Sequence, residues 1–209
     1  MRGEGVSLRS DRATHRMRAA TKAAEEHFTT AIGIGPEKAG LLSNYGLFLT
    51  HATPDYGRAR KYFKKAIDLA PHDEAFLGNY ATLAIIEGDL GKAWDLSYRA
   101  MKLGLANRDR LLTRPLFCAA VIFLLQEKDP SIPLGQLRQL FADGIDHAPW
   151  VITNLLKLCD ERLDPESAEL LRRISSAIDD GEMLLQLEAM PSWQAIEPVS
   201  LDTQWPDIK

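Results

Sequence analysis

The chain has 209 residues, of which 45% are hydrophobic and 26% charged, and its formal net charge at pH 7 is −4. These fractions are typical of a folded globular protein and exclude an intrinsically disordered chain. The longest apolar run, residues 115–125, is far shorter than the ~20 residues that a membrane-spanning helix needs.

The first segment, residues 1–12, has two glycines and no hydrophobic periodicity, so we predict a disordered basic arm. Residues 1–22 carry six basic against two acidic side chains, and such an arm could contact nucleic acid. No basic patch with interleaved aromatic residues follows, and the chain is acidic overall. We therefore favour a solvated terminus over a nucleic-acid-binding arm.

Helices are predicted next, because apolar residues recur at steps of three or four. The first covers residues 13–32 and ends at a Gly/Pro-rich segment, 33–36. Four further helices are predicted at residues 38–51, 56–69, 73–87 and 90–103. Short turns separate them, so consecutive helices are expected to pack as pairs.

The same sequence pattern occurs twice in this region. NYGLFL at residues 44–49 returns as NYATLA 35 residues later, and DYGRA at 55–59 returns as DLGKA 34 residues later. Self-similarity at this period predicts a solenoid of stacked helix pairs, in which one pair cannot bury its apolar face alone. A second pattern also recurs, in which a small residue is followed by an aromatic residue, another small residue and a proline at the same spacing. It occurs first as Ala24, Phe28, Ala31 and Pro36, and then as Ala59, Phe63, Ala66 and Pro71.

The pattern continues in weakened form toward the C-terminus. A third pair is predicted around Leu116 and Phe123, with a longer turn at 126–134. A fourth follows from Ile152, but Arg172 stands where its aromatic residue is expected. Residues 182–190 form a short amphipathic segment that would cover the last apolar face. The Pro/Trp-containing segment beyond residue 197 is expected to be loose.

The first helix of each pair has a large residue, a large–small pair and another large residue. Leu42, Tyr45-Gly46 and Leu49 follow this pattern, and Leu77, Tyr80-Ala81 and Ala84 occupy the corresponding positions of the next pair. In these positions the chain resembles the tetratricopeptide repeat family, and more narrowly bacterial tandem repeats of the NYALFL…DYDRAEELYRRALEADP type. The resemblance implies an all-α, right-handed solenoid of antiparallel helix pairs, with about 3–4 repeats. It would comprise a half-repeat helix at 13–36, the solenoid at 37–180, and a capping helix and tail at 181–209.

The resemblance also implies that the first helix of each pair lines a concave groove. The partner-binding positions carried over are Asn44, Leu47, His51, Asn79, Thr82, Ile86, Arg114, Val121, Trp150, Asn154 and Lys157. The recurring asparagines could pair with the backbone of an extended ligand, or bond across helices in a purely structural role. The inward lysines and arginines that grip a C-terminal carboxylate in some members are missing. The apolar lining, with Ile85 and Leu125, favours an amphipathic helix or a hydrophobic strand.

No motif points to catalysis, since the chain has no P-loop, no HExxH and no cysteine pair with metal-ligand spacing. No enzymatic activity, cofactor or metal is expected. Cys118 and Cys159 lie in apolar helical patterns, and no signal peptide precedes them, which favours buried thiols in a cytoplasmic protein. The predicted function is protein–protein interaction, as an adaptor, chaperone or inhibitor. The alternatives are a homodimeric scaffold that assembles through helix 13–32 and, less favoured, nucleic-acid binding through the basic arm.

Overall fold

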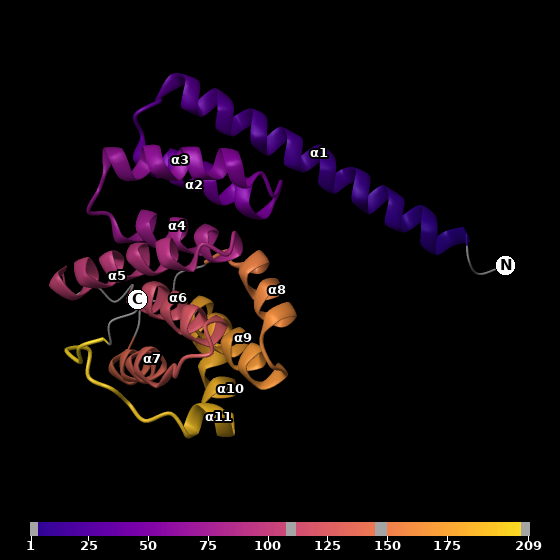
Figure 1. Cartoon of the computed structure of the whole chain (residues 1–209). Helices are drawn as coiled ribbons and strands as arrows, with labels where there is room; N and C mark the ends of the chain where they lie inside the picture. The colour runs from indigo at the N-terminus through magenta and orange to yellow at the C-terminus, as the bar shows by residue number, and fades with distance from the viewer. Residues whose placement is uncertain (1–3, 108–111, 145–149, 206–209) are drawn as a thin grey trace. The chain divides into compact units, whose positions relative to one another are not determined.

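The computed structural model describes residues 4–107, 112–144 and 150–205, and every regular element within them is helical (Figure 1). The longer helices are α1 (Glu4–Ile34), α2 (Ala39–His51), α3 (Tyr56–Leu69), α4 (Glu74–Ile86), α5 (Leu90–Asn107), α6 (Thr113–Leu125), α7 (Ser131–Asp143), α8 (Thr153–Arg162) and α9 (Pro165–Asp179). Three short elements follow, the 3-10 helix η2 (Gly181–Met183), α10 (Leu184–Glu188) and α11 (Pro191–Gln194). The prediction of an all-helical protein with paired neighbouring helices is confirmed.

The chain divides into two compact units, Met1–Leu69 and Ala70–Lys209. In the first unit α2 packs against α3 and α1 packs against α2. Helix α1 begins at Glu4, within the segment predicted to be disordered, because extending an existing helix is far easier than nucleating one. The ring of Phe28 holds α1 in place, with centroids 5.2 Å from Tyr45 and 5.3 Å from Phe48.

The repeated aspartates of the two similar turns are helix caps. The Oδ1 atom of Asp55 accepts the N–H of Arg58 at 3.1 Å, at the start of α3. The Oδ1 atom of Asp89 accepts the N–H of Lys92 at the same distance, at the start of α5. Each cap satisfies a backbone donor that the first turn of a helix leaves unpaired. The DYGRA and DLGKA sequences therefore serve the same local purpose in both units.

In the second unit the core gathers around α4 and α6. Helix α4 packs against α5, α6 and α8, and α6 packs against α5, α7 and α9. At the position where the fourth pair lacks its aromatic residue, the guanidinium group of Arg172 forms ion pairs with Asp160 of α8 and Glu169 of α9. Helices α10 and α11 pack on α9, where Leu187 and Trp193 are fully buried.

Candidate functional site

The predicted groove positions of the first unit are partly accessible. Asn44 is exposed, and Leu47 and His51 are half-buried. Both ring nitrogens of His51 are buried without a hydrogen-bond partner among the described residues. Burial lowers the pKa of His51 to about 4, so the ring is neutral at physiological pH.

In the second unit three of the predicted positions lie in the interior. Asn79 is 5% exposed, and Thr82 and Val121 are fully buried. The Thr82 hydroxyl group donates to the Gly78 carbonyl oxygen at 3.1 Å. Because α4 packs against both α6 and α8, these side chains face neighbouring helices of the same chain. They are therefore inaccessible to a partner in this structure.

The remaining predicted positions lie on or near α6 and α8. Trp150 is buried and its backbone N–H donates to Asp179 at 2.8 Å. The guanidinium group of Arg114 lies 5.6 Å from the centre of the Trp150 ring, and burial lowers the pKa of Arg114. Asn154 is half-buried, whereas Lys157 is exposed and forms an ion pair with Glu161 at 3.8 Å. Arg114 and Trp150 therefore contact each other, while Lys157 faces solvent.

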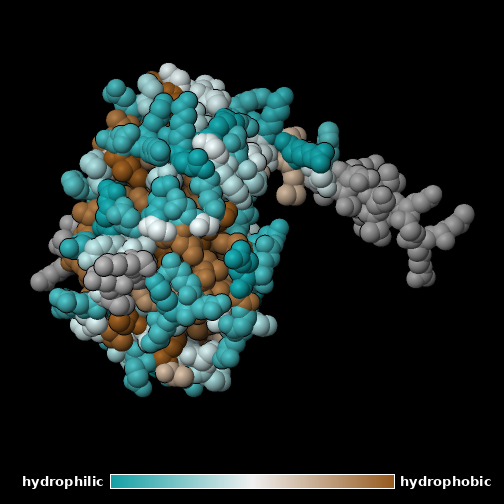
Figure 2. Space-filling view, viewed as in Figure 1, coloured by the Kyte–Doolittle hydropathy of each residue, from teal (hydrophilic) through white to brown (hydrophobic). Residues whose placement is uncertain are grey.

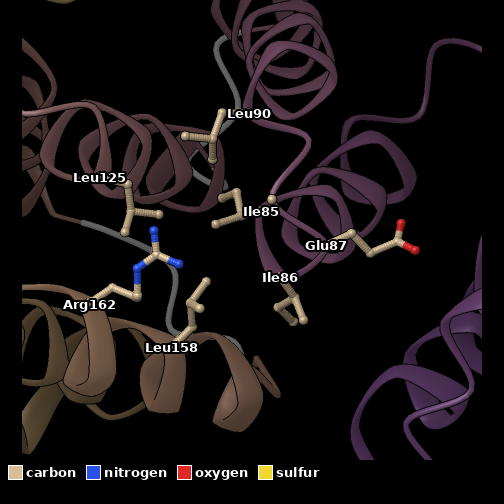
Figure 3. A pocket seen from close by; sticks show the side chains of 8 residues that line it. Ile85, Ile86, Glu87, Leu90, Leu125, Leu158 and Arg162 are labelled. Carbon is tan, nitrogen blue, oxygen red and sulfur yellow. The ribbon is translucent and has the colours of Figure 1, made fainter.

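An open cavity of about 220 Å³ remains at the C-terminal ends of α4, α6 and α8 (Figure 3). It is lined by Ile85, Ile86, Glu87, Gly88, Leu90, Leu125, Leu158 and Arg162. The guanidinium group of Arg162 points into the space between Leu125 and Leu158 (Figure 3). Within the described residues it has no hydrogen bond or ion pair. The cavity thus combines aliphatic walls with a guanidinium group that forms no ion pair with an acidic side chain of the described residues.

The sequence predicted three residues of this cavity and missed the others. Ile85, Ile86 and Leu125 were expected on the apolar lining, whereas Leu158 and Arg162 were not. The repeat pattern describes contacts between neighbouring pairs, but α8 reaches α4, two pairs away. No local signal in the sequence indicates that contact.

The two thiols are unsuited to nucleophilic chemistry. Burial raises the pKa of Cys118 and of Cys159 to about 12 in each case, so both remain protonated at neutral pH. Across the described ranges, no group of three or more His, Cys, Asp or Glu side chains is placed to hold a metal ion. None of the helices in those ranges combines the length and apolar character required to span a bilayer.

The surface in the view of Figure 2 is mainly hydrophilic, with apolar patches between the charged side chains.

No family model matches the chain, and a search of curated proteins gave no match. What the fold defines is therefore a class, an all-helical protein built from packed neighbouring helices.

Proposed function

We propose that this chain is a tetratricopeptide-like, right-handed solenoid of three to four helix pairs, and that it binds a peptide or helix of a partner protein without catalysis. The repeated spacing of the packing residues supports the repeat assignment, as do the capping aspartates Asp55 and Asp89 at corresponding turns. In such arrays a continuous surface made by successive pairs serves as the binding surface.

The cavity at the ends of α4, α6 and α8 carries the proposal. Its aliphatic walls offer burial to an apolar side chain, and Arg162 offers a charge-assisted hydrogen bond to a carboxylate. A volume of about 220 Å³ is below the usual range for drug-sized ligands and suits a single large side chain. The expected partner segment presents a large apolar residue next to an acidic one.

Site-specific photocrosslinking in the native host tests this function. A photoreactive amino acid replaces Ile86 in the full chain, and in the control it replaces Asp95, an exposed residue of α5 outside the cavity. We expect a discrete crosslinked partner from position 86 and none from position 95. The Arg162→Glu substitution should reduce that product about tenfold, whereas Arg162→Lys should retain part of it. Equal crosslinking from both positions, or indifference to Arg162→Glu, would show that the cavity is not the binding site.

A second candidate is a homodimer that assembles through α1. Met17 of α1 is 71% exposed, which leaves a large apolar side chain uncovered on this helix. A second copy of the chain could bury it. Light scattering on the full chain and on the Met17→Glu variant tests this candidate. If the chain dimerises through α1, the unmodified chain should have twice the monomer mass and the variant should have the monomer mass. A monomer mass for both excludes this candidate.

A further inference from the structure

The C-terminal segment that follows α11 lies along α7 as an extended peptide would. Figure 1 shows this segment, residues 195–205, passing α7 after it leaves α11. The Val199 backbone N–H donates to the Gly135 carbonyl oxygen at 3.0 Å. The side-chain amide of Gln136 donates to the carbonyl oxygens of Ser200, at 3.0 Å, and Leu201, at 3.4 Å. Gln136 is only 1% exposed, so this amide is a buried and fixed donor.

Helix α7 is shaped for close approach of a backbone. A Cβ atom at Gly135 would lie 2.5 Å from Val199 Cγ2 and 2.6 Å from the Glu197 carbonyl oxygen, so only glycine admits the segment here. One turn further, Arg138 donates to the carbonyl oxygens of Trp193 and Gln194 at the end of α11, at 3.1 and 2.7 Å, and to that of Ile196 in the segment. The Gln136 and Arg138 hydrogen bonds and the close approach of the Glu197 carbonyl group involve main-chain atoms, so an extended peptide of another sequence could make the same contacts.

A tryptophan anchors the far end of the segment. The Trp205 ring centroid lies 5.2 Å from that of Trp94 on α5 and 5.8 Å from that of Phe123 on α6. Beside this aromatic cluster is a cavity of about 440 Å³, lined by Tyr98, Met101, Lys102 and Leu105 of α5 and by residues 201–205. The segment therefore covers this face without filling it.

The segment also leaves polar atoms of the site unpaired. Gln136 Oε1 and Trp205 Nε1 are both buried, and neither has a hydrogen-bond partner among the described residues. A buried polar atom without a partner opposes the binding of whatever buries it. A peptide that donated a backbone N–H to Gln136 Oε1 would satisfy an acceptor that the chain's own segment leaves unpaired.

We infer that the face formed by α5, α6 and α7 is a peptide-binding site, occupied in cis by the segment 195–205 and able to take a partner peptide in trans. The sequence of this segment indicates what kind of partner peptide would bind. It is an extended segment with a β-branched residue and, six positions later, a tryptophan, as in Val199 and Trp205. In this chain Asp202 lies between these two residues and lines the same cavity as Lys102. An acidic residue is therefore expected at the corresponding position of the partner peptide. This inference concerns a different surface from the cavity at Arg162 and does not depend on it.

The test uses the full chain and a fluorescent synthetic peptide with the sequence of residues 195–205, followed by anisotropy. Trp205→Ala releases the tail and Trp205→Phe, the matched control, keeps a ring in the aromatic cluster. We expect the peptide to bind the Trp205→Ala variant at least about tenfold more tightly than the unmodified chain. The Trp205→Phe variant should stay within about threefold of the unmodified chain. Val199→Asp is a second releasing variant that leaves the aromatic cluster unchanged, and circular dichroism confirms that each variant is folded.

Two further measurements locate the binding. Adding Gln136→Leu to the Trp205→Ala variant should weaken peptide binding about tenfold, and so should replacing the tryptophan of the peptide by alanine. The inference is overturned if folded releasing variants bind the peptide no better than the unmodified chain, or if Gln136→Leu changes nothing. It is also overturned if the unmodified chain is a dimer that becomes monomeric on Trp205→Ala, because the occupant would then be the tail of a second copy.

Discussion

The ring of Phe63 occupies the space that a side chain at Gly46 would need. A Cβ atom built on Gly46 would lie 2.7 Å from Phe63 Cε1, closer than such atoms approach in proteins. Phe63 is fully buried, so its ring has little freedom to move away. This contact is what brings α2 and α3 together, and it explains why a small residue follows the tyrosine in the repeated pattern.

Two glycine substitutions test that contact by the same chemical change. Gly46→Ala should destabilise the protein by about 1–3 kcal/mol, because the added methyl group overpacks the core against Phe63. Gly78→Ala, in α4, should stabilise it by up to about 1 kcal/mol, since a Cβ there meets nothing within 4 Å and alanine is the better helix former. Urea unfolding midpoints measure both effects. Shifts in the same direction for the two variants would contradict the packing role of Gly46.

The buried His51 ring makes stability depend on pH. In the folded protein its pKa is lowered to about 4 by burial, whereas in the unfolded chain it stays near 6.5. Between these values the unfolded state binds more protons, so the contribution of His51 is complete above pH 6.5 and is lost as the pH falls toward 4. The loss should reach about 3 kcal/mol at most.

Unfolding free energies measured from pH 7 to pH 4 check this effect against a His51→Gln variant, which has no titrating ring. The unmodified chain should lose more stability than the variant over that range. An NMR titration of the His51 ring gives a direct readout, and a midpoint near 6.5 in the folded protein would refute the prediction.

The two cysteines should resist modification while the protein is folded. Because burial raises the pKa of Cys118 and Cys159 to about 12, neither thiolate forms at pH 8. A chromogenic disulfide reagent should therefore label neither thiol in the folded chain and both after denaturation. Lys157→Cys provides the control, since that side-chain position is 74% exposed and should react at once. Rapid labelling of the unmodified folded chain would show that these helices open readily.

Trp193 is the main anchor of the segment after α9. Its ring is fully buried, meets Phe141 edge-on at a centroid distance of 5.7 Å, and donates from Nε1 to Glu188 at 3.0 Å. Trp193→Ala should cost about 3–5 kcal/mol, because it removes the largest buried side chain of this region. Thermal unfolding measures the loss. Trp193→Phe keeps an aromatic ring and should cost less, so an equal loss in both variants would point to the N–H group instead of the ring.

The helices of the first two pairs could be predicted from the sequence because strong local signals define them. Helix α3 was predicted at residues 56–69 and has those bounds, since Asp55 caps its start and its apolar stripe is regular. Helix α5 continues to Asn107, beyond the predicted end at residue 103. Gly104 follows that predicted end, but a glycine inside a helix costs only about 1 kcal/mol relative to alanine, and the helix continues through it.

The recurring asparagines occupy equivalent positions in the sequence pattern, but they differ in solvent exposure. Asn44 is exposed and Asn79 is buried, although both precede the tyrosine of their pair. Helix α4 packs against α5, α6 and α8, and its contact with α8 joins elements two pairs apart, which a period of 34 or 35 residues does not describe. The groove positions on α2 remain a prediction.

The position of the tail could not be predicted either. Residues beyond 197 were expected to be loose, yet Val199, Ser200 and Leu201 form hydrogen bonds with α7. Their hydrogen bonds to Gly135 and Gln136 use main-chain atoms, and main-chain contacts leave no pattern in side-chain identity.

The contact between α8 and α4 limits how the number of helix pairs can change. Many solenoids tolerate duplication or deletion of a repeat, because each repeat contacts only its neighbours. Here an additional pair inserted between α5 and α6 would move α8 away from α4, separate the walls of the Arg162 cavity and expose the core positions on α4. Gain or loss of a pair in this unit would therefore require α8 to change with it, so related chains of different length should differ most in this helix.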